Sequence, residues 1–251
     1  AVYQSYLKKI AQTAADKRIS FAVETENELI RELLDDTFGD IGDNGNELQI
    51  LINNTGTDFY IIEKGKVFSG DRILLLISEL QMAEGKDVLI PEDAPSFVEN
   101  LSDKYGVAVH RVYGDQEASQ VFTKDDMLNN IWFFDRIFLI VKTLNVLATA
   151  EVTLSQLFDY QRDFATRKTI IEFDGDAREL RDVLGGFDEY NDGIYKVFER
   201  RNGKARLRQI GNTSKVRMLV EAADMEAAKE ISVQITEKLK RGNIDKRNQK
   251  M

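Results

Sequence analysis

Short apolar runs alternate with segments of helical spacing over residues 1–113, and this alternation restricts the fold more than any other feature. Apolar runs of about five residues, bounded by polar or glycine-containing turns, indicate strands. They lie at 19–24, 48–53, 59–63, 87–92 and 107–113. Helical spacing occurs at 1–13, 26–36, 70–83 and 95–106. Because strand–helix–strand order favours a parallel pair with a right-handed crossover, we expect an α/β fold here.

The remaining residues predict a different arrangement. The apolar segment 129–151 has no Gly or Pro and indicates one long buried helix, and residues 153–164 indicate another with Thr153 as N-cap. From about residue 167, a strand and a helix precede three short strands and a closing helix at 225–240. This order predicts an α+β domain with helices on an antiparallel sheet, an arrangement like that of the TATA-binding protein.

These patterns predict three domains and a tail. No flexible linker separates the domains, because the chain has only two prolines and no Ser/Gly-rich spacer. We expect an α/β unit at 1–85, a shorter α/β unit at 86–163, the α+β domain at 164–243 and a basic tail at 244–251.

Composition excludes several classes of protein. The 251 residues include no cysteine, which excludes disulfides and thiolate metal sites and is typical of a reducing cytoplasm. No apolar segment approaches the about 20 residues that span a bilayer, and the first residues lack a secretory signal pattern. A net charge of −9 argues against nucleic-acid binding. We therefore expect a cytoplasmic protein without membrane or nucleic-acid partners.

The α+β domain carries the most recognisable motif, in the turn between two of its strands. Residues 208–215 read "RQIGNTSK". This turn resembles the Arg-Pro-Ser-Gly-Thr-Glu-Pro-Lys loop of the α-D-phosphohexomutases (phosphoglucomutase and phosphomannomutase), which binds the phosphate of the substrate. Arg208, Gly211 and Lys215 match that loop in position.

Other segments follow in the order of the same family. "YLKKI", "ISFAVE" and "YIIEKGKVFSGDRILLLISEL" resemble parts of its second domain. "DVLIPEDAPSFVENLSDKYGVAVHRVYGD" and "FFDRIFLIVKTLNVLATAEVTLSQL" resemble the beginning and the last helices of a shortened third domain. The resemblance thus covers nearly the whole chain, from the second domain of the family onward. It also extends to the degenerate mutase-like region that follows the nucleotidyltransferase domain in bacterial proteins of the mannose-1-phosphate guanylyltransferase type.

Residues 53–58, "NNTGTD", correspond in this resemblance to the magnesium loop Asp-Gly-Asp-x-Asp-Arg. Asn53, Thr55 and Thr57 are neutral at the three carboxylate positions, and neutral groups do not offset the cost of dehydrating Mg²⁺. The resemblance also places the catalytic phosphoserine in a first domain outside this sequence, and the sugar-binding loop of the third domain is not recoverable. We therefore expect no catalytic residue, no metal and no cofactor.

The turn at 208–215 is the remaining candidate site. The resemblance implies that Arg208 and Lys215 supply charge while Gly211, Asn212 and Thr213 supply hydrogen-bond donors to a phosphate. The ligand would be a sugar phosphate or a nucleotide sugar. The alternative is an ordinary hairpin turn with flanking cations, which is favoured by Ile210 in place of the family's serine.

An apolar stripe at 132–139 predicts core, or, where exposed, an interface with a preceding domain or a second copy of the chain. Three functions stay open at this point. The chain is a non-catalytic regulatory or oligomerisation module of a sugar-1-phosphate nucleotidyltransferase, or a fragment of a diverged but active mutase whose serine lies upstream, or a purely structural module.

Overall fold

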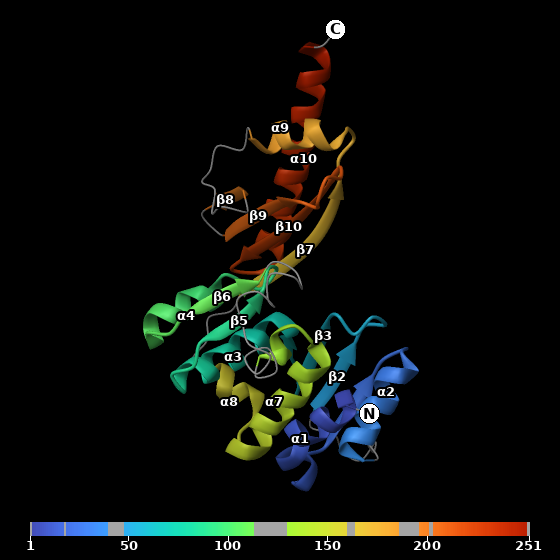
Figure 1. Cartoon of the computed structure of the whole chain (residues 1–251), viewed down its shortest axis with the longest axis vertical. Helices are drawn as coiled ribbons and strands as arrows, with labels where there is room; N and C mark the ends of the chain where they lie inside the picture. The colour runs from blue at the N-terminus through green and yellow to red at the C-terminus, as the bar shows by residue number, and fades with distance from the viewer. Residues whose placement is uncertain are drawn as a thin grey trace. The chain divides into compact units, whose positions relative to one another are not determined.

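The computed structural model describes residues 2–17, 19–39, 48–112, 130–159, 164–185, 196–200 and 203–249 (Figure 1). The chain divides into two compact units, residues 1–161 and 162–251. The expected boundary near residue 163 lies close to this division. The expected division between residues 85 and 86 falls inside the first unit and stays a prediction. No helix of the described ranges is long and apolar enough to cross a membrane.

The first unit is built on a four-stranded sheet. The strands, in spatial order, are β1 (Phe21–Glu24), β2 (Leu48–Ile52), β3 (Phe59–Glu63) and β4 (Lys66–Ser69). β1 and β2 are parallel, with α2 (Glu28–Phe38) between them in the chain, and β2, β3 and β4 run antiparallel. α1 (Val2–Asp16) contacts α2. The apolar pattern did not indicate β4, because Phe68 is its one buried residue.

α3 (Gly70–Ala83) has the bounds that the sequence predicted. Ser69 is its N-cap, and the Ser69 hydroxyl accepts the Arg72 N–H. Nine of the 14 residues are buried, so the helix is packed on most of its faces. A side chain at Gly70 would bring a Cβ to 2.9 Å from the Phe59 ring, so only glycine lets α3 begin this close to β3.

A parallel pair of strands follows α3. β5 (Val88–Pro91) and β6 (Val109–Val112) are joined through α4 (Phe97–Tyr105), which confirms the predicted strand–helix–strand order. α4 ends at Gly106, whose φ of +65° is in the left-handed region that favours glycine as a C-cap.

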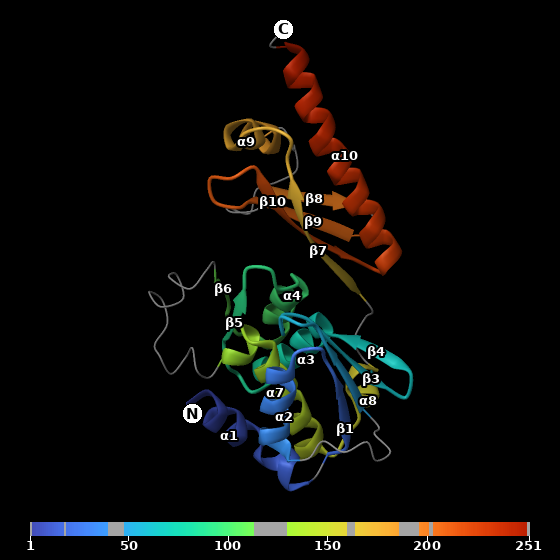
Figure 2. The ribbon, with the colours of Figure 1, turned by 90° about the vertical axis from the view of Figure 1, so that its right-hand side faces the viewer.

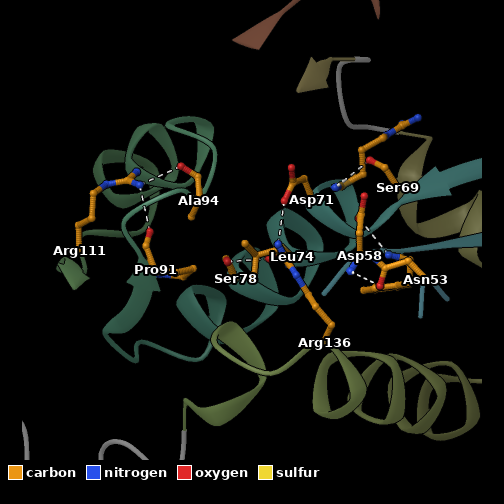
Figure 3. Close-up of polar contacts among 12 residues, drawn as sticks. Asn53, Asp58, Ser69, Asp71, Leu74, Ser78, Pro91, Ala94, Arg111 and Arg136 are labelled. Atoms are coloured by element: carbon orange, nitrogen blue, oxygen red, sulfur yellow. Dashed lines mark hydrogen bonds and ion pairs between the residues drawn. The ribbon is translucent and has the colours of Figure 1, made fainter. Parts of the chain in front are cut away.

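Arg111 of β6 fastens the loop that connects β5 to α4. Its Nη1 donates to the carbonyl oxygens of Pro91, Glu92 and Ala94 at 3.1, 2.9 and 2.8 Å (Figure 3). Its guanidinium also pairs with Glu99 at 2.6 Å, and its side chain is only 8% exposed. The loop is therefore tied to β6 by a buried cation.

The single helix predicted at 129–151 is wrong, because the chain breaks at Asp135. A short 3-10 helix, η1 (Ile131–Phe133), is followed by α7 (Arg136–Ala150). The Asp135 backbone is extended, and its Oδ1 accepts the N–H groups of Ile137 and Phe138 at 2.9 and 3.2 Å. This is an N-cap within an apolar run, and aspartate is among the residues that favour that position.

α8 (Leu154–Phe158) completes the first unit, and its predicted N-cap, Thr153, is confirmed by a capping box. The carboxylate of Glu63, at the end of β3, accepts the N–H groups of Leu154 and Ser155 at 2.9 Å each. Glu63 is 3% exposed, and the N-terminal N–H groups of a helix stabilise such a buried negative charge. α8 is thereby joined to the sheet.

The second unit is an antiparallel sheet with two helices, as predicted (Figure 2). Its strand order is β7 (Ala165–Glu172), β10 (Lys215–Ala222), β9 (Gly203–Gln209) and β8 (Lys196–Arg200). α9 (Ala177–Gly185) and α10 (Met225–Gln249) share one core cluster with alternate residues of β9 and β10, among them Leu207, Val216 and Met218. α10 continues past Lys240, so the predicted end of this helix is wrong. The basic tail at 244–251 stays a prediction. The likeness to the TATA-binding protein stays a prediction.

A buried ion pair joins the first turns of α3 and α7, and we expect its disruption to destabilise the first unit. Asp71 and Arg136 are 3.1 Å apart, and their side chains are 10% and 11% exposed (Figure 3). Asp71→Ala leaves the guanidinium buried without its partner, so it should lower the free energy of unfolding by about 3 kcal/mol in urea denaturation. Lys17→Ala, which removes an exposed ion pair, is the control and should have little effect. Equal effects of the two variants would contradict the prediction.

Candidate functional site

The predicted phosphate loop is the turn of the β9–β10 hairpin. The hairpin closes where the Ile210 N–H donates to the Lys215 carbonyl oxygen at 2.9 Å. Gly211 has a φ of +54°, in the left-handed region that glycine adopts without strain. Gly211, Asn212 and Thr213 are exposed, so the tip of the turn faces solvent.

Part of the turn is engaged in its own hydrogen bonds. The hydroxyl and the amide of Thr213 both donate to the Ile210 carbonyl oxygen, at 2.6 and 3.2 Å. Gln209 Nε2 donates to the carbonyl oxygens of Thr213 and Ala177 at 2.7 and 2.9 Å, which ties the turn to α9. Thr213 therefore shapes the turn, and its two protons are used there. The amides of Gly211 and Asn212 donate to no residue within the described ranges.

Three cations share one face of the sheet beside this turn. Arg208 of β9 is directly opposite Arg217 of β10. Lys215 is two residues from Arg217 on β10, so the two side chains point to the same face. Lys215 Nζ is 3.1 Å from Glu172 Oε1, but these side chains are 50% and 76% exposed, so the pair is weak. Arg217 was not identified from the sequence, although its i, i+2 spacing from Lys215 was a usable signal.

A fourth cation reaches the turn from α9. Arg181 Nη1 donates to Asn212 Oδ1 at 3.2 Å. The side-chain Nδ2 protons of Asn212 therefore point away from Arg181. No sequence signal linked Arg181 to the turn, because the two are brought together only when α9 packs on the sheet. The turn thus combines backbone N–H groups with positive charge, which is the chemistry that binds anions such as phosphate.

The loop that corresponds to the magnesium loop connects β2 and β3, in the other compact unit. Asn53 Oδ1 accepts the N–H groups of Thr57 and Asp58 at 2.9 and 3.2 Å (Figure 3). It also accepts the Thr55 hydroxyl at 3.3 Å, while Asn53 Nδ2 donates to Thr57 Oγ1 at 3.1 Å. The Thr55 and Thr57 hydroxyls are hydrogen-bonded to each other at 2.8 Å. The side chain of Asn53 thus organises the whole loop.

The oxygen atoms of this loop are poor ligands for a magnesium ion. A metal would need the oxygen lone pairs that Asn53 Oδ1 now offers to three protons, and it would need negative charge. Asp58 is the one carboxylate of the loop, and its Oδ1 accepts the N–H of the adjacent Phe59 at 2.9 Å. The loop is held by its own side chains and by hydrogen bonds of Asn54 with Glu26 and Asn27.

The apolar stripe at 132–139 is mostly core. Phe133, Phe138 and Leu139 are 1%, 1% and 0% exposed. Phe134, at the break before α7, is 46% exposed. The interface expected at this stripe therefore depends on Phe134 and stays a prediction.

Comparison with known proteins gives a fold but no sequence relative. The sequence matches no protein-family model and no curated protein. A phosphoglucomutase/phosphomannomutase family protein from Burkholderia thailandensis has a similar structure, with a TM-score of 0.59 and 15% identity over 94% of this chain and 64% of that protein. An Aspergillus fumigatus N-acetylphosphoglucosamine mutase, in complex with glucose 1,6-bisphosphate, has a TM-score of 0.58 and 12% identity over 95% of this chain and 64% of that protein.

A third structure is described as an N-acetylglucosamine-phosphate mutase of the α-D-phosphohexomutase superfamily, with a TM-score of 0.55 and 11% identity over 94% of this chain and 65% of that protein. The fold is that of the phosphohexomutases. Identities this low show the fold alone. The chain spans 64% of the length of the first two mutases, so it has the phosphohexomutase fold over part of such a protein.

We expect no specific magnesium binding at residues 53–58. Thermal unfolding with and without millimolar Mg²⁺, at matched ionic strength, should show no saturable shift. Replacing the three neutral residues together, Asn53→Asp, Thr55→Asp and Thr57→Asp, should create Mg²⁺-dependent stabilisation of about 2.7 kcal/mol at 100 times the Kd. Saturable stabilisation of the unmutated protein that Asn53→Ala removes would contradict this prediction.

Proposed function

We propose that this chain is a non-catalytic phosphohexomutase-like region that binds a sugar phosphate or a nucleotide sugar at the β9–β10 turn. The observation that carries the proposal is the group of Arg208, Arg217 and Lys215 on one sheet face, beside the exposed amides of Gly211 and Asn212. The sugar would lie at the open side of the turn.

Electrostatics supports an anion at this face. Arg208 and Arg217 are directly opposite each other, and like charges at such positions destabilise a sheet unless other groups compensate. Both arginines have other contacts within the protein, so a phosphate would add to existing interactions. The exposed Lys215–Glu172 pair exchanges partners at little cost, which lets Lys215 turn to a ligand.

The similar structures support a phosphorylated sugar as the ligand. The Aspergillus mutase was solved with glucose 1,6-bisphosphate, and another of its structures contains GlcNAc-6P and magnesium. This chain has cations at the β9–β10 turn and neutral residues at positions 53, 55 and 57. We therefore propose that the chain binds a phosphorylated sugar without transferring a phosphoryl group and without a metal cofactor. The proposed location is the cytoplasm.

The parent protein in this proposal is a sugar-1-phosphate nucleotidyltransferase of the mannose-1-phosphate guanylyltransferase type, in which this region regulates activity or supports an oligomer. A glycine-rich nucleotide loop in the full-length sequence would support this parent. A Thr-Ala-Ser-His-Asn-Pro-like stretch would support the rival, a diverged mutase that is still active. A purely structural module is the third possibility, and it predicts no ligand at the turn.

Calorimetric titration tests the proposal. We expect mannose-1-phosphate, glucose-1-phosphate, their 6-phosphates or GDP-mannose to bind with a Kd of about 1 mM or lower, which corresponds to about 4 kcal/mol. Arg208→Ala combined with Lys215→Ala should abolish binding, because each charge-assisted contact contributes about 1.5–3 kcal/mol. Lys8→Ala combined with Lys229→Ala removes two exposed cations elsewhere and should leave binding unchanged.

The control ligands are mannose and inorganic phosphate, which separate the contribution of the sugar from that of the charge. Binding that survives in the Arg208 and Lys215 double variant would place the ligand elsewhere and contradict the proposal. No heat from any phosphorylated ligand would leave the structural module as the function of the chain.

A further inference from the structure

A hollow of about 630 Å³ lies in the first unit, between α3, η1 and α7, and it is separate from the turn discussed above. On α3 it is lined at 77, 80, 81 and 84, and on α7 at 142, 145, 146 and 149. Both sets have the spacing i, i+3, i+4, i+7, which places each set on a single face of its helix. The lining also includes Trp132 of η1, together with Ala83, Lys86 and Ala150. The volume is within the range of about 300–1,000 Å³ that is typical of small-molecule sites.

The hollow contains a lysine without a carboxylate partner. Lys142 is half-buried, and its Nζ lies over the Trp132 ring, 5.0 Å from the ring centroid. No carboxylate of the described ranges forms an ion pair with it. The nearest acid in the lining, Glu84, is already bonded to Lys86 at 2.6 Å. Burial lowers the pKa of the Lys142 ammonium, Glu84 raises it, and Lys86 lowers it to a smaller extent, so the effect of burial exceeds the attraction of Glu84.

A hydrogen-bond donor lies beside this lysine. Asn145 is three residues from Lys142 on α7, so the two side chains are neighbours. Asn145 Oδ1 accepts the Ala14 N–H at 3.2 Å, which fixes the orientation of the amide. Its Nδ2 has no acceptor within the described ranges. The Thr149 hydroxyl, which donates to the Asn145 carbonyl oxygen at 2.7 Å, leaves only acceptor capacity towards the hollow.

The rest of the lining is apolar except for Gln81, whose Nε2 donates to the Asp87 carbonyl oxygen and to Asn130 Oδ1. This surface suits a ligand with an apolar body. Ile77, Leu80, Val146 and Ala150 supply aliphatic surface, and Trp132 supplies an aromatic edge. The charged groups are Lys142, Lys86 and Glu84, with a sum of one positive charge. A single negative charge balances this sum, and a carboxylate accepts from an ammonium and an amide together.

We propose that this hollow binds a small monocarboxylate with an aromatic or short aliphatic body, whose carboxylate pairs with Lys142 and accepts a hydrogen bond from Asn145 Nδ2. A dianionic phosphate ester fits less well, because the lining has no arginine and its second lysine is engaged by Glu84. The proposal does not depend on sugar-phosphate binding, since none of the lining residues belongs to the β9–β10 turn.

Trp132 gives a direct measurement, because it is the only tryptophan of the chain. Its fluorescence would be followed during titration with benzoate, phenylacetate and hexanoate. Benzyl alcohol, benzylamine and phenyl phosphate serve as neutral, cationic and phosphorylated counterparts. We expect a saturable change with at least one carboxylate and at least tenfold weaker binding of each counterpart.

Variants test the assigned contacts. Lys142→Met keeps the length of the side chain and should weaken carboxylate binding at least tenfold, with an unchanged or higher Tm because a desolvated charge is removed. Lys8→Met, at an exposed position of α1, is the matched control. Val146→Phe fills the hollow and should also weaken binding, so the result does not depend on one variant. Arg208→Ala combined with Lys215→Ala should leave carboxylate binding unchanged.

Three outcomes would overturn the proposal. The first is the lack of a saturable fluorescence change with every carboxylate. The second is binding that Lys142→Met and Val146→Phe leave unchanged. The third is equal or tighter binding of phenyl phosphate or benzyl alcohol, which would assign the hollow to another class of ligand.

Discussion

The ion pair between Asp71 and Arg136 fixes the place where the two central helices of the first unit begin. Arg136 is the first residue of α7, where the helix dipole disfavours a positive charge, and Asp71 is the second residue of α3, where the dipole favours a negative one. The Asp71 carboxylate therefore offsets the unfavourable position of the Arg136 charge at the start of α7, and both side chains are buried. The contact joins the first turns of α3 and α7, and the same two helices line the hollow that contains Lys142.

Elements with local signals could be predicted from the sequence. α3 has a capping serine before fourteen residues of apolar spacing, and Gly106 ends α4 in a conformation that other residues avoid. Elements without such signals were missed. Asp135 breaks an apolar run that would otherwise be one helix, and its capping role depends on an extended backbone. α10 continues to Gln249 through a segment that contains Gly242 and Asn243, which are poor helix formers, and a single apolar residue, Ile244, so neither propensity nor apolar spacing predicts it.

The candidate sites show the same division between local and long-range information. The neutrality of Asn53, Thr55 and Thr57 is visible in the sequence, whereas the hydrogen bonds that use up the Asn53 amide oxygen need the folded loop. Arg217 joins Arg208 only through strand register, and Arg181 joins Asn212 only through the packing of α9. The hollow combines residues near 84, 132 and 142, which no local pattern relates to one another.

The loop at 53–58 takes its shape largely from its own side chains, so its backbone geometry does not depend on a metal-binding motif. A loop shaped by a bound ion must keep all its ligands, because losing one removes the ion and the shape together. A loop shaped by an asparagine and two threonines needs no carboxylate at these positions, so the β2–β3 connection forms without a bound ion.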